Sequence, residues 1–236
     1  MDLAPVTRTE PRPDGAQPVG QVRSWRRPAV GAGLVVAFVG LAVVVESGWL
    51  AGVDRSVLRW TAQHRTGALE TVAGAIVTLA TPQLLILATL AVGAWQIGAR
   101  RSRAVLIGVA VRLGLLVLSV VALKNVLARP SPPLHASFDY TPLDTLAHMT
   151  QFGEGGAFPS GHTTTTIVCV AVLLGLAGAG SRVRRFVLVG AVAAVSASLV
   201  YMGFHWFSDV VGAWLLGSAI LAVPVPAVPS RDAGAP

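Results

Sequence analysis

Residues 104–127 of the sequence, AVLIGVAVRLGLLVLSVVALKNVL, form an apolar run that is long enough to cross a lipid bilayer as a helix. Arg112 and Lys124 are the charged side chains in this run. Arginine-rich segments border it and other runs like it, which is typical of short connections between membrane spans. The run therefore predicts a transmembrane helix, and the chain on either side of it can be interpreted in the same way.

Five other apolar segments predict five further spans, at residues 29–45, 69–99, 162–179, 186–203 and 205–223. Pro82 interrupts the second span and predicts a kink there. Residues 49–65 have amphipathic helical spacing, which favours a helix lying along the membrane surface. We therefore expect an all-α, polytopic membrane protein in which six transmembrane helices form a bundle, with the interfacial helix on its outer face.

The composition of the chain supports this fold class. Of its 236 residues, 53% are hydrophobic and 12% are charged, whereas a soluble domain carries about 25% charged residues. The net charge of +7 comes from arginines grouped between apolar segments, which indicates membrane topology and not a nucleic-acid surface, so no nucleic-acid partner is expected. The single cysteine, Cys169, lies inside a predicted span, which excludes a disulfide framework and a cysteine-based metal site.

The chain is expected to form one membrane domain, residues 29–223, between disordered cytoplasmic tails at residues 1–28 and 224–236. In a six-span topology, the basic residues before the first span and those of two arginine-rich loops fall on one side. Positively charged loops are enriched in the cytoplasm, so that side and both termini are predicted to be cytoplasmic. The arginines concerned are Arg23, Arg26, Arg27, Arg100, Arg101, Arg103, Arg182, Arg184 and Arg185.

The outer side receives the end of the third span, the start of the fourth, and the junction of the fifth and sixth. Lys124, the only lysine in the sequence, and Arg129 lie at the first of these places. An isolated lysine at the end of a span is commonly a side chain that reaches from apolar surroundings to the interface. The alternative, that Lys124 binds an anion, depends on what lies near it.

The tetrapeptide Pro159-Ser160-Gly161-His162 opens the fourth span. Glycine permits close approach of the backbone, and the N–H groups at a helix start attract anions. The segment therefore predicts an anion site in which His162 donates a proton to a leaving oxygen. The plainer interpretation is an ordinary helix start with Ser160 as its cap.

His205 and Asp209 are four residues apart at the start of the sixth span, so they lie on one helical face. A carboxylate behind an imidazole fixes its tautomer and strengthens the far nitrogen as a nucleophile. A purely structural His–Asp hydrogen bond would have the same spacing. The sequence thus brings two histidines, a carboxylate and two cations to one predicted face of the membrane.

Together these segments resemble the three signature motifs of the type 2 phosphatidic acid phosphatase family, whose fold is shared with vanadium haloperoxidases and bacterial acid phosphatases. The first motif, K-x6-R-P, aligns with residues 124–132. The second, P-S-G-H, is intact at residues 159–162, and the third, S-R-x5-H-x3-D, aligns with residues 198–209. The order and spacing of the three motifs make the resemblance specific.

Two arginines of the family pattern are replaced in this chain, by Ser131 in the first motif and by Leu199 in the third. In the family both arginines hold phosphate oxygens. Arg129 precedes the first of these positions, and the resemblance implies that it substitutes in part. Each lost charge-assisted hydrogen bond is worth roughly 1.5–3 kcal/mol, so the replacements predict slow turnover or a different substrate.

The resemblance implies a metal-independent lipid-phosphate phosphatase without a cofactor, and the predicted topology places its active site on the extracytoplasmic side of the plasma membrane. His205 would attack the phosphorus to form a phosphohistidine, Asp209 would orient it, and His162 would protonate the leaving alkoxide. The expected partners are a lipid phosphate substrate and membrane lipids, and the oligomeric state is not predicted. The residues that would hold the phosphate are Lys124, Arg129, Ser160 and Gly161.

Two alternatives stay open from the sequence. A phosphotransferase of the same fold would pass the phosphoryl group to another acceptor, and a catalytically degenerate protein would bind lipid without turnover. Arg112 lies in mid-span, and we expect it to face the bundle interior and to pair with a group that the sequence does not identify. The residues of the long outer loop are expected to be solvated; they include Asp139, Asp144, His148 and Glu154.

Overall fold

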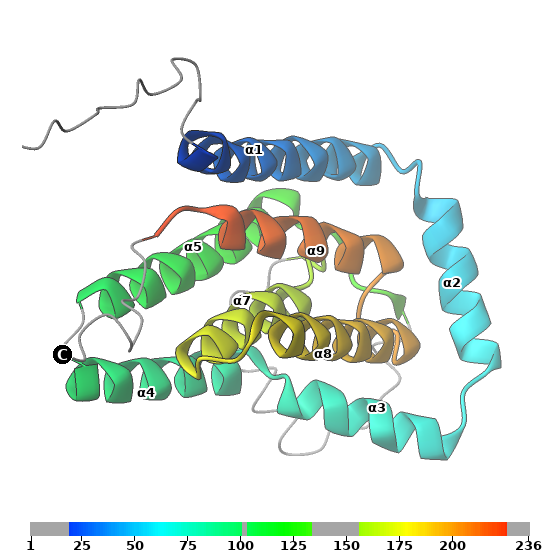
Figure 1. Ribbon diagram of the computed structural model, residues 1–236. Coiled ribbons are helices and arrows are strands. Elements are labelled where there is room, and N and C mark those ends of the chain that lie inside the picture. The colour runs from blue at the N-terminus through cyan, green and yellow to red at the C-terminus, as the bar shows by residue number, and fades with distance from the viewer. Residues whose placement is uncertain (1–18, 101–102, 134–155, 226–236) are drawn as a thin grey trace, which may run out of the picture.

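The computed structural model describes residues 19–100, 103–133 and 156–225, and every regular element in these ranges is helical (Figure 1). The prediction of an all-α protein is therefore confirmed. The predicted loop residues Asp139, Asp144, His148 and Glu154 lie outside the described ranges. The helices are α1 (Val19–Glu46), α2 (Ala51–Gln63), α3 (Gly67–Leu79), α4 (Pro82–Arg100), α5 (Arg103–Leu127), α7 (Gly161–Leu176), α8 (Ser181–Tyr201) and α9 (Phe207–Ala222).

Six apolar segments in the described ranges correspond to the six predicted spans. α1 from Pro28 onward, α5 and α8 are each long and apolar enough to cross a membrane. α3 and α4 qualify together as one span with a bend of 42° between them, whereas α7 and α9 are shorter apolar helices. The bend lies at the predicted place, because Pro82 is the first residue of α4, where its missing N–H leaves no helical hydrogen bond unmade.

The start of the first helix differs from the prediction. α1 begins at Val19 and not at residue 29, so the tail predicted for residues 1–28 extends too far into the chain. The predicted boundary followed the apolar side chains, which mark where a helix meets lipid and not where its backbone hydrogen bonds begin. Residues 1–18 and 226–236 lie outside the described part, and the tails there stay predictions.

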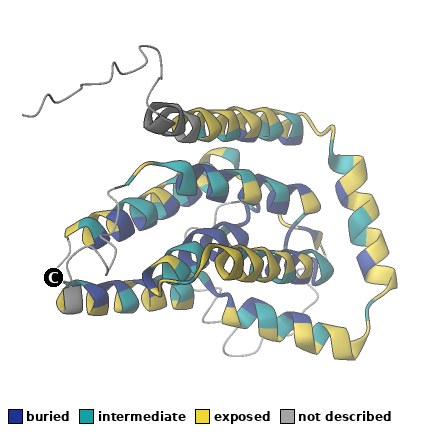
Figure 2. Cartoon of the chain, in the orientation of Figure 1, coloured by how far each residue is buried: buried dark blue, intermediate teal, exposed yellow. Residues whose placement is uncertain are grey.

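α7 lies at the centre of the bundle, packed against α4, α5, α8 and α9, while α1 covers α9. Val168 and Cys169 of α7 are fully buried, together with Leu116 of α5. Figure 2 shows buried residues on the inner sides of the central helices and a largely exposed α1. The outward side chains of α1 and α5 include large apolar ones such as Val36 and Leu118, as expected for helices surrounded by lipid.

The antiparallel course of the chain brings the three motif segments to one end of the bundle. α5 and α8 end there, and α7 and α9 begin there. α2, the predicted interfacial helix, crosses this end (Figure 1) and packs on α8 and α9. Nη2 of Arg65 donates hydrogen bonds to the carbonyls of Tyr201 and Met202, at 3.2 and 2.8 Å, which joins the end of α2 to the end of α8.

Candidate active site

The start of α9 holds a histidine and a carboxylate in contact. Oδ2 of Asp209 accepts a hydrogen bond from the backbone N–H of Trp206 at 2.9 Å, which caps this helix start. The same oxygen lies 3.3 Å from Nδ1 of His205. A carboxylate at Nδ1 favours the tautomer with its proton on Nδ1, so Nε2 keeps its lone pair. Asp209 is fully buried, and His205 is 9% exposed.

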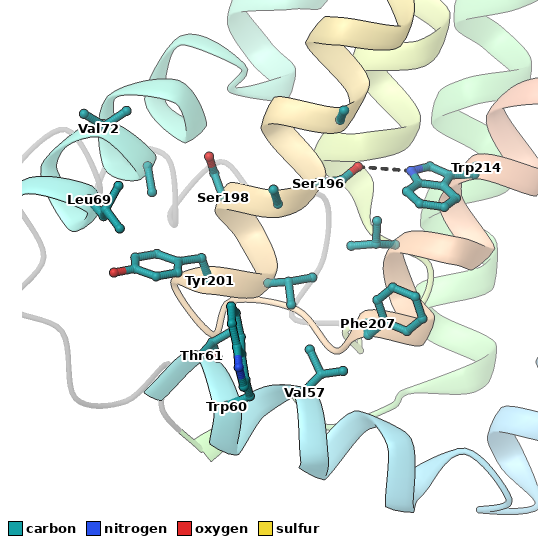
Figure 3. Close-up of a pocket in the computed structure, with 15 residues that line it drawn as sticks. Val57, Trp60, Thr61, Leu69, Val72, Ser196, Ser198, Tyr201, Phe207 and Trp214 are labelled. Atoms are coloured by element: carbon teal, nitrogen blue, oxygen red, sulfur yellow. Dashed lines mark hydrogen bonds between the residues drawn. The ribbon is translucent and has the colours of Figure 1, made fainter. Parts of the chain in front are cut away.

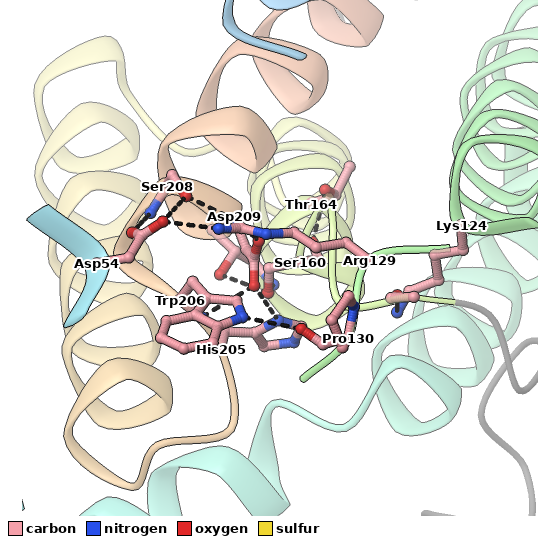
Figure 4. A network of polar contacts seen from close by, with 12 residues as sticks. Asp54, Lys124, Arg129, Pro130, Ser160, Thr164, His205, Trp206, Ser208 and Asp209 are labelled. Atoms are coloured by element: carbon pink, nitrogen blue, oxygen red, sulfur yellow. Dashed lines mark hydrogen bonds and ion pairs between the residues drawn. The ribbon is translucent and has the colours of Figure 1, made fainter. Parts of the chain in front are cut away.

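The guanidinium of Arg129 bridges two buried carboxylates (Figure 4). Nη1 lies 2.5 Å from Oδ1 of Asp209 and 2.8 Å from Oγ of Ser208, and Nη2 lies 2.7 Å from Oδ2 of Asp54. Its Cζ lies 5.6 Å from the centre of the Trp206 ring, which is a cation–π distance. The sequence suggested Arg129 as a phosphate ligand, and the structure engages its guanidinium with carboxylates of the protein itself.

Asp54 of α2 is the member of this network that the sequence did not single out. It is 2% exposed and accepts hydrogen bonds from the N–H and the hydroxyl of Ser208, at 2.9 and 2.7 Å. A buried carboxylate is costly without partners, and Ser208 and Arg129 supply them. One signal was present in the sequence: Asp54 shares a helical face with Val57 and Thr61, and this face turns toward the bundle.

Residues 159–162 begin α7 as the sequence predicted. Ser160 is the N-cap, its Oγ accepts a hydrogen bond from the N–H of Thr163 at 3.4 Å, and its side chain is fully buried. The N–H of Ser160 donates to the carbonyl of Asp209 at 3.1 Å, which fixes the start of α7 against the start of α9. The Ser160 hydroxyl therefore acts as a helix cap. Gly161 lies in the first turn, where the backbone N–H groups have no partner within the helix.

Lys124 reaches this helix start from α5. Its Nζ donates a hydrogen bond to the carbonyl of Gly156 at 2.8 Å, and its own carbonyl accepts one from the N–H of Gly156 at 3.1 Å. A side chain at position 161 would contact Cε of Lys124 at 3.7 Å, so Gly161 leaves the lysine stem directly against the first turn of α7. The ammonium group therefore lies beside the α7 start.

His162 is the second residue of α7 and is half-buried, and its carbonyl accepts a hydrogen bond from the hydroxyl of Thr166 at 2.8 Å. The structure thus brings together the end of α5, the start of α7 and the start of α9, as expected from the sequence, and adds α2 through Asp54. The catalytic and phosphate-holding roles of the individual residues stay predictions.

The two positions that lack the motif arginines have different surroundings. Ser131 is exposed. Leu199 is fully buried in an apolar cluster that contains Val77, Ala80 and Val195. A charged side chain at Leu199 would lose its hydration in a place packed with apolar atoms, whereas one at Ser131 would keep it.

A cavity of about 530 Å³ lies between α2, α3, α8 and α9 (Figure 3). Its walls are almost entirely apolar, and α9 contributes Phe207, Val210 and Trp214. At about 100° per helical residue, these three side chains occupy a different face of α9 from Asp209. The cavity therefore lies on a face of α9 that is turned away from the Asp209 carboxylate. Its apolar walls suit the apolar part of a membrane lipid better than a phosphate group.

Comparisons with known proteins match the chain to one family. The family model of the PAP2 superfamily matches residues 103–232, more than half of the chain and the part that contains α5, α7, α8 and α9. No curated protein matches the sequence. The fold is similar to the crystal structure of the first transmembrane PAP2 type phosphatidylglycerolphosphate phosphatase from Bacillus subtilis, with a TM-score of 0.62 and 22% identity, covering 80% of this chain and 91% of that one.

Proposed function

The chain belongs to the PAP2 superfamily, and from this premise we propose that it is a membrane phosphatase that hydrolyses a phosphomonoester or diphosphate of a lipid through a phosphohistidine at His205. The observation that carries the proposal is the 3.3 Å contact between Nδ1 of His205 and Asp209. In the tautomer with its proton on Nδ1, which this contact favours, Nε2 is the nucleophilic nitrogen. The backbone hydrogen bond between Ser160 and Asp209 holds the α7 start, with Gly161 and His162, next to it.

In the first half-reaction, Nε2 of His205 forms a bond to phosphorus while the bond from phosphorus to the leaving oxygen breaks. His162 donates a proton to that oxygen, and the dephosphorylated lipid departs. In the second half-reaction, water attacks the phosphorus and gives a proton to His162, and the phosphorus–nitrogen bond breaks to release inorganic phosphate. Both histidines then have the protonation state in which they began.

The charge that grows on the phosphoryl oxygens needs a preorganised positive environment. In this proposal, Lys124 and the N–H groups in the first turn of α7 supply it. Arg129 has a further role beside the phosphate contact that the sequence predicts: it holds the carboxylates of Asp54 and Asp209, and Asp209 orients His205. Arg129 and Asp54 are therefore positioning residues.

The proposed orientation places this site at the extracytoplasmic surface of the plasma membrane and both chain ends in the cytoplasm. It is supported by Arg184 and Arg185, which lie near the start of α8 at the end of the bundle opposite to His205. Arginine-rich loops are enriched on the cytoplasmic side. The lipid enters from the outer leaflet, and its headgroup meets the starts of α7 and α9. The reaction as proposed uses no metal and no cofactor.

A second candidate function is a catalytically degenerate lipid-binding protein, and the observation that favours it is the burial of Leu199. Where the family motif has an arginine, this side chain is packed in an apolar cluster, and Ser131 is uncharged at the other replaced position. Two absent charge-assisted hydrogen bonds, at roughly 1.5–3 kcal/mol each, slow turnover by about 10² to 10⁴-fold. A degenerate protein would bind a lipid phosphate and release no phosphate from it.

Release of inorganic phosphate by the detergent-purified protein in the presence of EDTA tests the proposal. Phosphatidic acid, phosphatidylglycerol phosphate and a polyprenyl diphosphate are offered in turn. His205→Gln is compared with His64→Gln, a matched control because His64 is exposed at the end of α2 and stacks on Trp60. We expect release from at least one lipid, reduced about 10³-fold or more in His205→Gln and unchanged in His64→Gln.

Each of the other outcomes contradicts a different part of the proposal. Phosphate release that survives in His205→Gln contradicts the phosphohistidine mechanism. Binding of a lipid phosphate by the wild-type protein without any release indicates the degenerate protein. Transfer of a labelled phosphoryl group to a lipid or sugar acceptor, in place of water, indicates a phosphotransferase.

A further inference from the structure

At the end of the bundle opposite to the candidate active site, the structure contains a cavity of about 800 Å³. The first halves of α5 and α8, the last halves of α7 and α9, and Val30 of α1 enclose it. Three arginines line it: Arg112 of α5, and Arg184 and Arg185 at the start of α8. Among the described residues that line this cavity there is no carboxylate, so its charge is positive.

The guanidinium of Arg112 keeps donors that the described part of the protein does not use. Its Nη1 donates to the carbonyl of Gly108 on the same helix at 3.3 Å, which is the described partner of this side chain. None of the ion pairs formed within the described ranges involves Arg112, Arg184 or Arg185. A guanidinium has five N–H donors, so all three arginines can bind an added anion.

The cavity combines this charge with apolar walls. Arg112 lies nine residues after Arg103, about 13 Å along α5, and its bond to Gly108 turns it back toward the Arg103 end. Arg184 and Arg185 are exposed near the start of α8. The cations therefore extend from the surface into the bundle. Between them lie apolar side chains, among them Val105, Val109, Val172, Leu188 and Leu221.

We propose that this cavity is a non-catalytic binding site for the anionic headgroup of a phospholipid in the cytoplasmic leaflet. The phosphodiester accepts hydrogen bonds from Arg184, Arg185 and the remaining donors of Arg112, and an acyl chain lies along the apolar wall. A basic cavity between spans attracts anionic headgroups, and the cytoplasmic leaflet supplies lipids that carry them. A soluble anion would gain nothing from the apolar walls, so the lipid is the better match.

This site is separate from the candidate active site. Lys124 lies twelve residues beyond Arg112 on α5, which is about 18 Å along the helix axis and more than one headgroup can bridge. α7, α8 and α9 likewise separate the two ends by their full lengths. A lipid bound near Arg184 and Arg185 therefore does not compete with a phosphate group at His205, and the proposal does not depend on turnover.

Native mass spectrometry of the full-length protein in detergent, with phosphatidylserine or phosphatidylcholine added, tests this proposal. Phosphatidylserine is chosen because it is not a product of any substrate considered above. We expect the wild-type protein to retain one phosphatidylserine in preference to phosphatidylcholine. The double variant Arg184→Gln, Arg185→Gln should bind phosphatidylserine about tenfold more weakly. Arg182→Gln is the matched control, because Arg182 lies in the same helical turn but does not line the cavity.

Equal phosphatidylserine affinity in the wild-type protein and the double variant would overturn the proposal, and so would an equal loss in Arg182→Gln. Phosphatidylcholine bound as tightly as phosphatidylserine, or inorganic phosphate bound as tightly as either lipid, would overturn the assignment to an anionic lipid. Phosphate release and the thermal unfolding midpoint are measured on each variant. Both should stay at the wild-type value, which separates the failure of this site from the failure of the proposed enzyme.

Discussion

The two ends of the bundle hold their charged side chains in opposite ways. At the start of α9, the guanidinium of Arg129 lies within 2.7 Å of carboxylate oxygens of both Asp54 and Asp209. At the other end, the described hydrogen bond of Arg112 is to a carbonyl of its own helix. A guanidinium that is bonded to protein carboxylates fixes the geometry around it. A guanidinium with unused N–H donors can bind a ligand.

The end of the bundle that contains Arg129, called here the paired end, is joined by contacts between distant elements. Asp54 comes from α2, Arg129 follows α5, and Asp209 begins α9, so three elements that are distant in the sequence meet at one guanidinium. Asp209 also contacts His205, and any change in the network is therefore passed to the imidazole. The comparison predicts large effects for substitutions at the paired end and small ones at the end that contains Arg112.

The largest effect is expected for Asp54→Ala. It leaves Arg129 buried with one carboxylate fewer and removes the acceptor of the Ser208 N–H, so the free energy of unfolding should fall by about 3–5 kcal/mol. Equilibrium unfolding in mixed SDS micelles measures this change. Arg112→Gln, at the opposite end, should change the same quantity by less than about 1 kcal/mol. Equal losses in both variants would contradict the comparison.

A milder variant separates positioning from stability. Asp54→Asn keeps an acceptor for Ser208 but removes the charge that faces Arg129. If Asp54 acts through Asp209 on His205, kcat per folded molecule should fall by about tenfold while KM for the lipid stays constant, because substrate contacts are unchanged. A kcat at the wild-type value, with only the folded fraction reduced, would leave Asp54 a purely structural residue.

The next largest effect on stability and phosphate release is expected where α9 contacts the segment before α7. A methyl group at Gly212 would lie 2.5 Å from Cε2 and 2.6 Å from Cζ of Phe158, which is fully buried and stacks on Phe38. Gly212→Ala should therefore lower the free energy of unfolding by about 1–3 kcal/mol and displace residues 158–162, with a loss of phosphate release. Gly190→Ala is the control, since nothing lies within 4 Å of its added methyl, and it should leave both quantities unchanged.

A smaller effect, an increase in phosphate release, is expected for a substitution at Ser131. This residue is exposed, so Ser131→Arg adds a cation near the proposed phosphate site without burying it, and phosphate release should rise about tenfold. Ser131→Gln, of similar size and uncharged, should leave release unchanged. Arginine at Leu199, the other replaced position, should destabilise the protein, because that side chain is fully buried among apolar residues. A rise in release in the Gln variant equal to that in the Arg variant would exclude the charge as its cause.

The smallest effect is expected at the other end of the bundle. Arg184 and Arg185 are exposed and form no ion pair within the described ranges, so replacing both with Gln should move the thermal unfolding midpoint in lipid-free detergent by less than about 2 °C. Differential scanning fluorimetry measures it. A larger drop in the unfolding midpoint would mean that the two arginines stabilise the fold, which would contradict their role as ligand-binding residues.

The apolar pattern of the sequence was sufficient to predict the fold. A segment inside a bilayer must satisfy its backbone hydrogen bonds internally, so each long apolar run becomes a helix whatever its neighbours are. The bend at Pro82 follows from a second local rule, that proline interrupts a helix. The start of α1 at Val19 was not predicted, because the residues before the span carry no apolar signal.

The candidate site was predicted only where local motifs mark it. Lys124, the segment at residues 159–162, and the His205–Asp209 pair each show a recognisable spacing. Asp54 does not, because its partners Arg129 and Ser208 lie 75 and 154 residues away and only tertiary packing joins them. For the same reason, the sequence suggested that Arg129 binds phosphate and did not reveal the two carboxylates that hold it.

The proposed chemistry at His205 is tested most directly by mapping the phosphorylated residue in the variant His162→Ala after mixing with p-nitrophenyl phosphate. The nitrophenolate leaves without a proton, so the first half-reaction no longer needs His162, whereas the attack of water still does. Phosphate should accumulate on His205, and none should be found when His205→Gln is added to the variant. Nitrophenolate release with no phosphate on His205, or with phosphate on another residue, would contradict it.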